Sequence, residues 1–248
     1  MEAWIVALLA AGMLVAAFGY ASVGHGGASA YIAAMALAGI APAEMRPIAL
    51  LLNILVSSLG TWKFHRAGFF RWRLLWPFAV VSIPMAYVGG AITLPGQAYK
   101  ILVGVVLLYA AWQLWRSGKS GEEMREVREP PLLWAMLIGG AMGVLAGLTG
   151  VGGGIFLSPL LLMLGWAGTK QTSAVAAPFI LVNSLAGLAA VFIAKSAALP
   201  TYVWFLVPAV LIGGWLGAEF GSRRFANPVV RRVLASVLAL AGAKMISV

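Results

Sequence analysis

Two glycine clusters, about half the chain apart, carry the residues best suited to binding chemistry. The first reads Gly19-Tyr20-Ala21-Ser22-Val23-Gly24-His25-Gly26-Gly27, and the second reads Gly147-Leu148-Thr149-Gly150-Val151-Gly152-Gly153-Gly154. Glycine permits positive φ and close approach to a ligand, so successive backbone N–H groups can converge on an anion. A short apolar helix is expected to begin after each cluster, around Gly27 and Ile155, with a partial charge of about +0.5 at its N-terminus. The pattern predicts a site for a small anion.

Polar side chains near the clusters could complete this site. Asn53 and Asn183 each lie within the next long apolar segment and are candidate donors to oxyanion oxygens. The full set of candidate binding residues is Ser22, Gly24, His25, Gly26, Gly27, Asn53, Ser57, Thr149, Gly150, Gly152, Gly153, Gly154 and Asn183. The alternative is structural, because glycines also serve close helix packing and buried amides also link helices.

Three charged or titratable residues near the clusters have more than one interpretation. His25 titrates in the range that suits proton coupling or a charged contact to the anion, and a neutral His25 bonded to a carbonyl is the alternative. Arg46 and Lys170 occupy corresponding positions after the two short helices. For both we expect a solvated or headgroup-facing position rather than a binding role.

The elements that position these residues are membrane helices. Hydrophobic residues make up 62% of the 248 residues, charged residues 10%, and the mean hydropathy is +0.97. A soluble domain has about 25% charged residues, so the fold class is an all-α polytopic membrane protein. At the scale of a bilayer the apolar segments are 4–18, 29–37, 47–62, 74–92, 101–115, 132–148, 156–164, 173–194, 202–220 and 229–246.

The segments form two matching series, 1–116 and 131–248, separated by a charged cytoplasmic linker at 117–130. If each glycine-broken segment crosses the membrane once, 10 of the 17 Lys and Arg residues lie on the cytoplasmic side. If each is a hairpin that returns to its own side, 13 of the 17 do, and the positive-inside rule favours this second arrangement. We therefore expect two inverted repeats, each a glycine-broken hairpin plus three transmembrane helices.

Composition also excludes several classes of function. The chain has no Cys and two His, which excludes disulfides and thiolate metal sites and disfavours any metal site. The net charge of +10 comes from short loops between apolar segments, which indicates lipid headgroups and not nucleic acid as the partner. No carboxylate is expected deep in a span, Glu219 near a span end being the nearest, so we expect neither an enzyme nor a cofactor.

The segment from Gly150 to Gly165 closely resembles the glycine-rich motif of the TauE/SafE family of sulfite exporters. Asn53 with 66–68, and 181–187 in the second half, resemble the family's following segments. The resemblance implies a carrier in the bacterial inner membrane that exports small sulfur-containing anions such as sulfite, thiosulfate or organosulfonates. An anion channel, or a carrier of another small organic anion, is the alternative.

Overall fold

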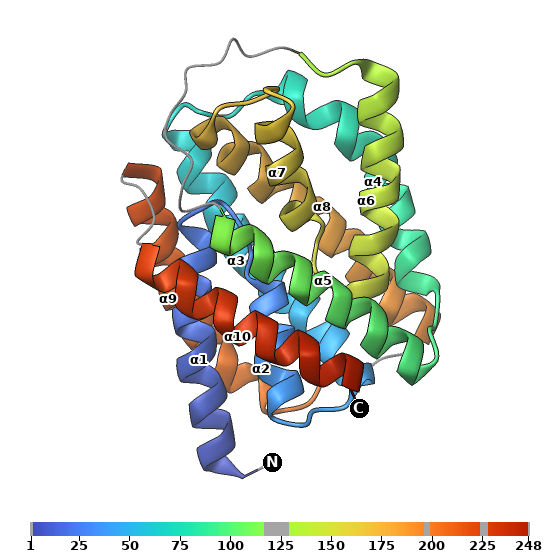
Figure 1. The fold of residues 1–248 in the computed structure, drawn as a ribbon, viewed down its shortest axis with the longest axis vertical. Coiled ribbons are helices and arrows are strands. Elements are labelled where there is room, and N and C mark those ends of the chain that lie inside the picture. The colour runs from blue at the N-terminus through green and yellow to red at the C-terminus, as the bar shows by residue number, and fades with distance from the viewer. Residues whose placement is uncertain (1, 117–128, 196–198, 224–227, 248) are drawn as a thin grey trace.

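The computed structural model describes residues 2–116, 129–195, 199–223 and 228–247, and helices are the only regular secondary structure within them (Figure 1). They are α1 (Ala3–Ala21), α2 (Ala28–Leu37), α3 (Pro42–Arg66), α4 (Trp72–Ala91), α5 (Gly96–Arg116), α6 (Leu132–Thr149), α7 (Gly154–Met163), α8 (Thr169–Lys195), α9 (Val203–Arg223) and α10 (Pro228–Ser247). Each apolar segment predicted from the sequence overlaps one helix, so the all-α polytopic prediction is confirmed.

Among the described residues, seven helices are long and apolar enough to cross a bilayer, namely α1, α3, α4, α5, α6, α8 and α9. Large apolar side chains cover the outward faces, and Trp4, Leu133 and Phe205 each expose more than 60% of their surface. Such a surface suits lipid tails, and the protein is a multi-pass membrane protein. The short helices α2 and α7 have 10 residues each, about 15 Å of rise, which is half of a bilayer's hydrocarbon core.

The structure differs from the sequence prediction at the start of α3. The helix begins at Pro42, five residues before the predicted Pro47. Ala41, the residue before the helix, is extended, with φ −66° and ψ 140°. Pro42 lacks a backbone N–H, but the N–H at the first helical position has no acceptor within the helix, so no hydrogen bond is lost. The earlier start places Arg46 on the helix, where its side chain can be buried. The predicted linker falls largely on 117–128, which lies outside the described residues, so the domain division stays a prediction.

Each long helix before a glycine break packs against a helix from the other half of the chain. The glycines of α9 lie on α1, where a Cβ on Gly213 would stand 2.2 Å from the backbone oxygen of Leu14. The glycines of α6 lie on α4, where a Cβ on Gly143 would stand 2.3 Å from the backbone oxygen of Ser82. Small residues allow this backbone-to-backbone approach, which is how membrane helices associate without a hydrophobic driving force.

The buried apolar side chains therefore form two main cores that do not follow the order of the sequence. The first core draws mostly on α1, α2, α3, α5, α9 and α10, and the second on α4, α6, α7 and α8. In Figure 1 teal α4 and yellow-green α6 lie at the right and α7 at the upper centre, whereas blue α1 lies at the lower left and red α10 runs from the left to the C-terminus at the lower right. Central helices α3 and α8 pack against each other between them, with Gly60 on Ala177.

Candidate functional site

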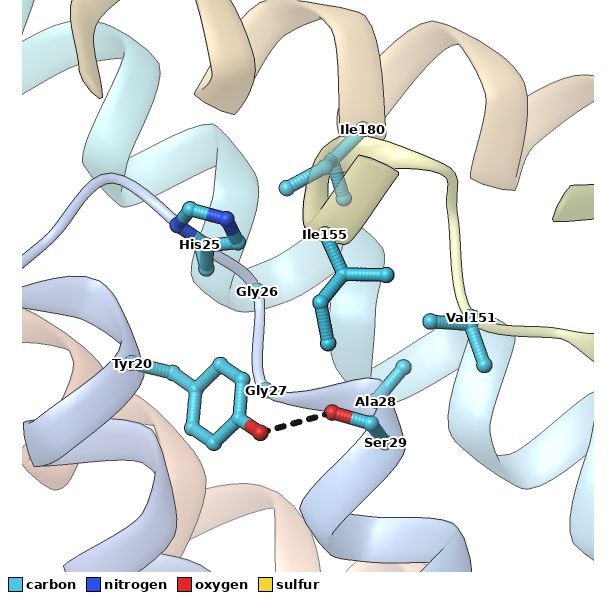
Figure 2. Close-up of a pocket in the computed structure, with 9 residues that line it drawn as sticks. All are labelled: Tyr20, His25, Gly26, Gly27, Ala28, Ser29, Val151, Ile155 and Ile180. Carbon is cyan, nitrogen blue, oxygen red and sulfur yellow. Dashed lines mark hydrogen bonds between the residues drawn. The ribbon is translucent and has the colours of Figure 1, made fainter. Parts of the chain in front are cut away.

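A small cavity lies where the two glycine breaks meet (Figure 2). It is lined by Tyr20, His25, Gly26, Gly27, Ala28, Ser29, Val151, Ile155 and Ile180. The first break contributes most of this lining, the second contributes Val151 and Ile155, and α8 adds Ile180. The free space between these atoms is about 10 Å³, enough for about one water molecule. The two breaks therefore pack closely against each other.

The backbone at both breaks has the conformation that the glycines predict. Gly27 has φ +94° and immediately precedes α2, while Gly153 has φ +80° and immediately precedes α7. No side chain caps either helix, so capping groups do not occupy the first N–H groups. The first four N–H groups of a helix also lack intrahelical acceptors, and they carry the positive end of the helix dipole. Both helix starts therefore offer donors where the two breaks meet.

His25 joins the first break to the second. Its Nε2 lies 3.2 Å from the carbonyl oxygen of Gly154 and 3.2 Å from Oγ of Ser158, and its Nδ1 lies 3.0 Å from the carbonyl oxygen of Val23. Carbonyl oxygens only accept, so a neutral ring, with one N–H, can donate to only one of them. A doubly protonated ring donates to both. The hydrogen bonds that His25 can make therefore differ between the neutral and the doubly protonated ring, and proton coupling would require such a difference.

Asn53 lies between the two glycine turns and is fully buried. Its Nδ2 donates to Oγ of Ser184 at 2.9 Å and to the carbonyl oxygen of Val151 at 3.4 Å. A Cβ added to Gly26 would stand 1.8 Å from Oδ1 of Asn53, and one added to Gly152 would stand 2.4 Å from its Nδ2. Glycine is therefore required on both sides of this amide, because any side chain there would occupy the same space.

The other candidate residues lie around the cavity but do not line it. Ser22 and Ser57 donate to carbonyl oxygens within their own segments, at 2.7 Å and 2.6 Å. Gly24 packs on Ser173, and Gly150 on the Arg46 side chain. Thr149 accepts a bond from the Val151 N–H, while Asn183 donates to Phe179 and keeps a buried Oδ1 without a hydrogen-bond partner. Gly152 and Gly154 face Ile180. Their part in anion binding stays a prediction.

Six residues that line the cavity are missing from the set predicted from the sequence, namely Tyr20, Ala28, Ser29, Val151, Ile155 and Ile180. Tyr20 accepts a hydrogen bond from Ser29 at 2.8 Å across the floor of the cavity (Figure 2), and Tyr31 donates to the carbonyl oxygen of Gly26 at 2.8 Å. Ile180 is three residues before Asn183, so the helical period of α8 places both side chains on similar faces of the helix. This spacing could have indicated Ile180 from the sequence. For the tyrosines no spacing in the sequence indicated a contact with the break.

The prediction that Arg46 faces solvent or headgroups is wrong. Only 6% of its surface is exposed, and its guanidinium donates to the carbonyl oxygens of Gly89 and Gly90 at 2.8 Å and 2.6 Å and to that of Ile92 at 3.2 Å. The last carbonyls of α4 have no intrahelical donors and carry the negative end of its dipole. These carbonyl oxygens therefore attract the Arg46 guanidinium, which the charge pattern alone had placed at the membrane surface.

The model of the family described as sulfite exporter TauE/SafE matches residues 8–245. The chain belongs to this family. A probable membrane transporter protein of Sinorhizobium fredii, y4hK, is 40% identical over 241 residues, which cover 96% of this chain and 97% of the relative. A probable membrane transporter protein of a Sinorhizobium species, ORF9, is 27% identical over 205 residues, 82% of this chain and 76% of the relative. No solved structure matches the chain.

Membership of the TauE/SafE family makes the protein a membrane transporter and not an enzyme. The described residues of this TauE/SafE protein contain no group of three His, Cys, Asp or Glu side chains that could hold a metal ion. Val151 and Ile155 of the second break belong to the first core and Leu157 of α7 to the second, so the glycine breaks lie where the two main cores meet.

Proposed function

We propose that this protein is a secondary transporter of the bacterial inner membrane that moves small sulfur-containing anions, in the export direction, by alternating access. The observation that carries the proposal is the cavity between the starts of α2 and α7, neither of which has a side-chain cap. Their N–H groups and positive dipole ends provide donors for an oxyanion without a full buried charge at the cavity. The cavity has room for about one water molecule, so binding of a sulfur anion requires the two breaks to move apart, and the smallest anions require the least movement.

Contacts between helix ends support the inverted arrangement of the two hairpins. Lys63 at the end of α3 forms an ion pair with Glu219 near the end of α9, and the hydroxyl of Tyr202 donates to the Glu44 carboxylate at 2.9 Å. The Lys170 ammonium lies 5.0 Å from the centre of the Phe69 ring. If both broken segments are hairpins, the partners in each pair lie on one side of the membrane. If both cross fully, the partners lie on opposite sides.

The C-terminal end supplies a fourth contact of this kind. Lys244 near the end of α10 donates to the carbonyl oxygens of Ala36 and Leu37, both at 3.1 Å. The end of α2 and the end of α10 therefore lie together, and in Figure 1 the two chain termini lie at the same end of the molecule. This arrangement follows if α2 returns to the side from which α1 entered. The hairpins then enter from opposite sides, as in transporters built from inverted repeats.

The membrane potential supplies a driving force for export of an anion. Moving one negative charge out of a cell that is negative inside releases about 2.3 kcal/mol per 100 mV. Proton coupling through His25, whose two ring nitrogens lie beside carbonyl oxygens, would add to this force if protons moved inward in exchange for the anion. An anion channel would use the same helix starts, and its distinguishing property is a route that is open to both sides at once.

The test is counterflow of labelled sulfite in proteoliposomes, with thiosulfate, sulfoacetate, sulfate and chloride as competitors. A carrier gives saturable exchange that a sulfur anion inhibits, and the exchange persists without net charge movement. Currents that grow linearly with concentration and show no counterflow would contradict the carrier and support a channel. Absence of exchange with every sulfur anion, in protein shown to be folded by its tryptophan fluorescence, would contradict the sulfur-anion assignment.

A further inference from the structure

Arg46 is a buried cation at one end of the boundary between the two main cores. It lies in the second turn of α3, and its guanidinium binds the carbonyl oxygens of Gly89, Gly90 and Ile92 at the end of α4. Its Nε is also buried and has no hydrogen-bond partner. A Cβ on Gly150 would stand 3.2 Å from Cγ of Arg46, so the side chain lies directly behind the second glycine break.

The charge of Arg46 has no carboxylate to balance it among the described residues. Glu44, two residues before it, accepts a hydrogen bond from Tyr202, and Glu219 pairs with Lys63 and Arg223 near the other end of α3. Within the part of the chain that the structure describes, peptide carbonyl dipoles are what compensates the guanidinium. A charge buried in this way costs free energy that a purely structural contact between apolar helices would not require. Inside membrane proteins such groups usually mark the route of an ion.

The contacts of Arg46 also cross between the two cores. Ile48 and Leu52, on the same helix as Arg46, belong to the first core, whereas Leu75 and Phe78 of α4 belong to the second. A neighbouring polar contact crosses in the same region, because the Tyr99 hydroxyl donates to the carbonyl oxygen of Thr149 at 3.2 Å. Relative movement of the cores at this end must break the Arg46 hydrogen bonds and release their donors.

We propose that Arg46 is the gate of the anion route at the end where α3 begins and α4 ends. In the closed state the Arg46 guanidinium binds the last carbonyl oxygens of α4. In the open state it releases these carbonyls and binds an oxyanion of the transported class instead. A guanidinium suits both states, because its planar fork binds carbonyls singly and oxyanions with two parallel hydrogen bonds. This inference rests on the proposed transport function, which supplies the anion and the movement. It adds a second anion-binding position, outside the cavity.

The closing part of the proposal can be tested without a substrate, because the chain has no Cys. Ala28→Cys places a single thiol in the cavity lining, and Gln97→Cys places one on an exposed position at the start of α5. A membrane-impermeant maleimide, applied from the Arg46 side, should label Ala28→Cys slowly when Arg46 is present. Arg46→Gln should speed this labelling about ten-fold or more, Arg46→Lys less, and Lys100→Gln, a matched loss of charge at the start of α5, should not.

Labelling of Gln97→Cys should be equal in all backgrounds, which controls for access of the reagent. The gate is contradicted if Arg46→Gln labels the cavity thiol no faster than the parent. Should Arg46→Gln fail to fold, Arg46→Lys decides in the same way, because it keeps the charge but cannot hold three carbonyls in the fork geometry.

The anion-binding part is tested by kinetics. Arg46→Gln should raise the half-saturating sulfite concentration from the Arg46 side about 10- to 100-fold, the loss expected for one charge-assisted hydrogen bond, and Lys100→Gln should not. An equal increase from both sides, or none, would contradict anion binding at Arg46. If the parent protein exchanges no sulfur anion but the labelling differences appear, the proposed substrate is wrong and the gate stands.

Discussion

Replacing Gly26 with alanine tests whether the two glycine breaks meet around the Asn53 amide. The backbone at Gly26 does not have positive φ, so alanine is conformationally allowed and only its Cβ matters. That Cβ would stand 1.8 Å from Oδ1 and 2.6 Å from Cγ of Asn53, distances that real atoms do not reach. The Asn53 side chain must therefore rotate away, and its Nδ2 must leave Ser184 and the carbonyl oxygen of Val151.

The magnitude follows from the interactions lost. Each of the two hydrogen bonds contributes about 0.5–1.5 kcal/mol to stability, and an amide forced from its rotamer costs about 0.5–1.5 kcal/mol. Gly26→Ala should therefore lower the free energy of unfolding by about 1.5–4.5 kcal/mol. In a chain of this size the midpoint of thermal unfolding should fall by at least about 3 °C. The cavity should lose sulfite binding as well, because Asn53 moves between the breaks.

The assay is thermal unfolding in detergent, followed by tryptophan fluorescence, with labelled sulfite counterflow alongside. Gly12→Ala is the matched control, because a Cβ there meets nothing within 4 Å and alanine favours the helix α1. The double variant Gly26→Ala with Asn53→Ala removes the clash, so its effect should be smaller than the sum of the single effects by at least about 1 kcal/mol. Additive effects, or equal midpoints for Gly26→Ala and Gly12→Ala, would refute this geometry.

Three further substitutions probe other contacts. If His25 carries the coupled proton, His25→Gln should keep sulfite exchange but lose the acceleration of net uptake by an imposed pH gradient; an unchanged response would exclude that role. Tyr99→Phe removes one hydrogen bond to the end of α6 and should cost about 1 kcal/mol, measured as a fall in the unfolding midpoint that Tyr109→Phe does not reproduce. Gly217→Val places a Cβ 2.2 Å or less from the backbone of α1 and should prevent folding, measured by size-exclusion chromatography, whereas Gly96→Val, in open space, should give folded protein.

The sequence predicts the helices of this protein well, for a physical reason. A bilayer requires each spanning segment to satisfy its own backbone hydrogen bonds, so a long apolar run has one available structure. The breaks are equally predictable, because Gly27 and Gly153 hold positive φ that other residues rarely adopt. The start of α3 was missed because Arg46 was interpreted as a surface charge, and only the three-dimensional contacts show its partners.

The composition of the site was predictable only in part. The sequence places His25, Gly26 and Gly27 at a break, and these residues line the cavity. It cannot place Tyr20 or Ile180, because their position depends on how α1 and α8 rotate about their axes. Nor can it distinguish Asn53, which reaches across to Ser184, from Asn183, whose amide bonds within its own helix. Equivalent positions in the two halves have acquired different contacts.

The packing of the helices constrains how such a protein can open. Tight backbone contact joins α1 to α9 and α4 to α6, so neither pair can separate without losing contacts that only glycine permits. The polar contacts at the cavity are different, because His25 and Asn53 each connect the first core to the break before α7 or to α8. Hydrogen bonds of this kind exchange partners at little cost when a ligand or water replaces them. We therefore expect the two cores to move relative to each other, with the cavity between them. Helix α4 should move together with the second hairpin, and α9 together with the first. The units expected to move are then not the two halves of the sequence, although each half contributes one of the two helix starts at the cavity.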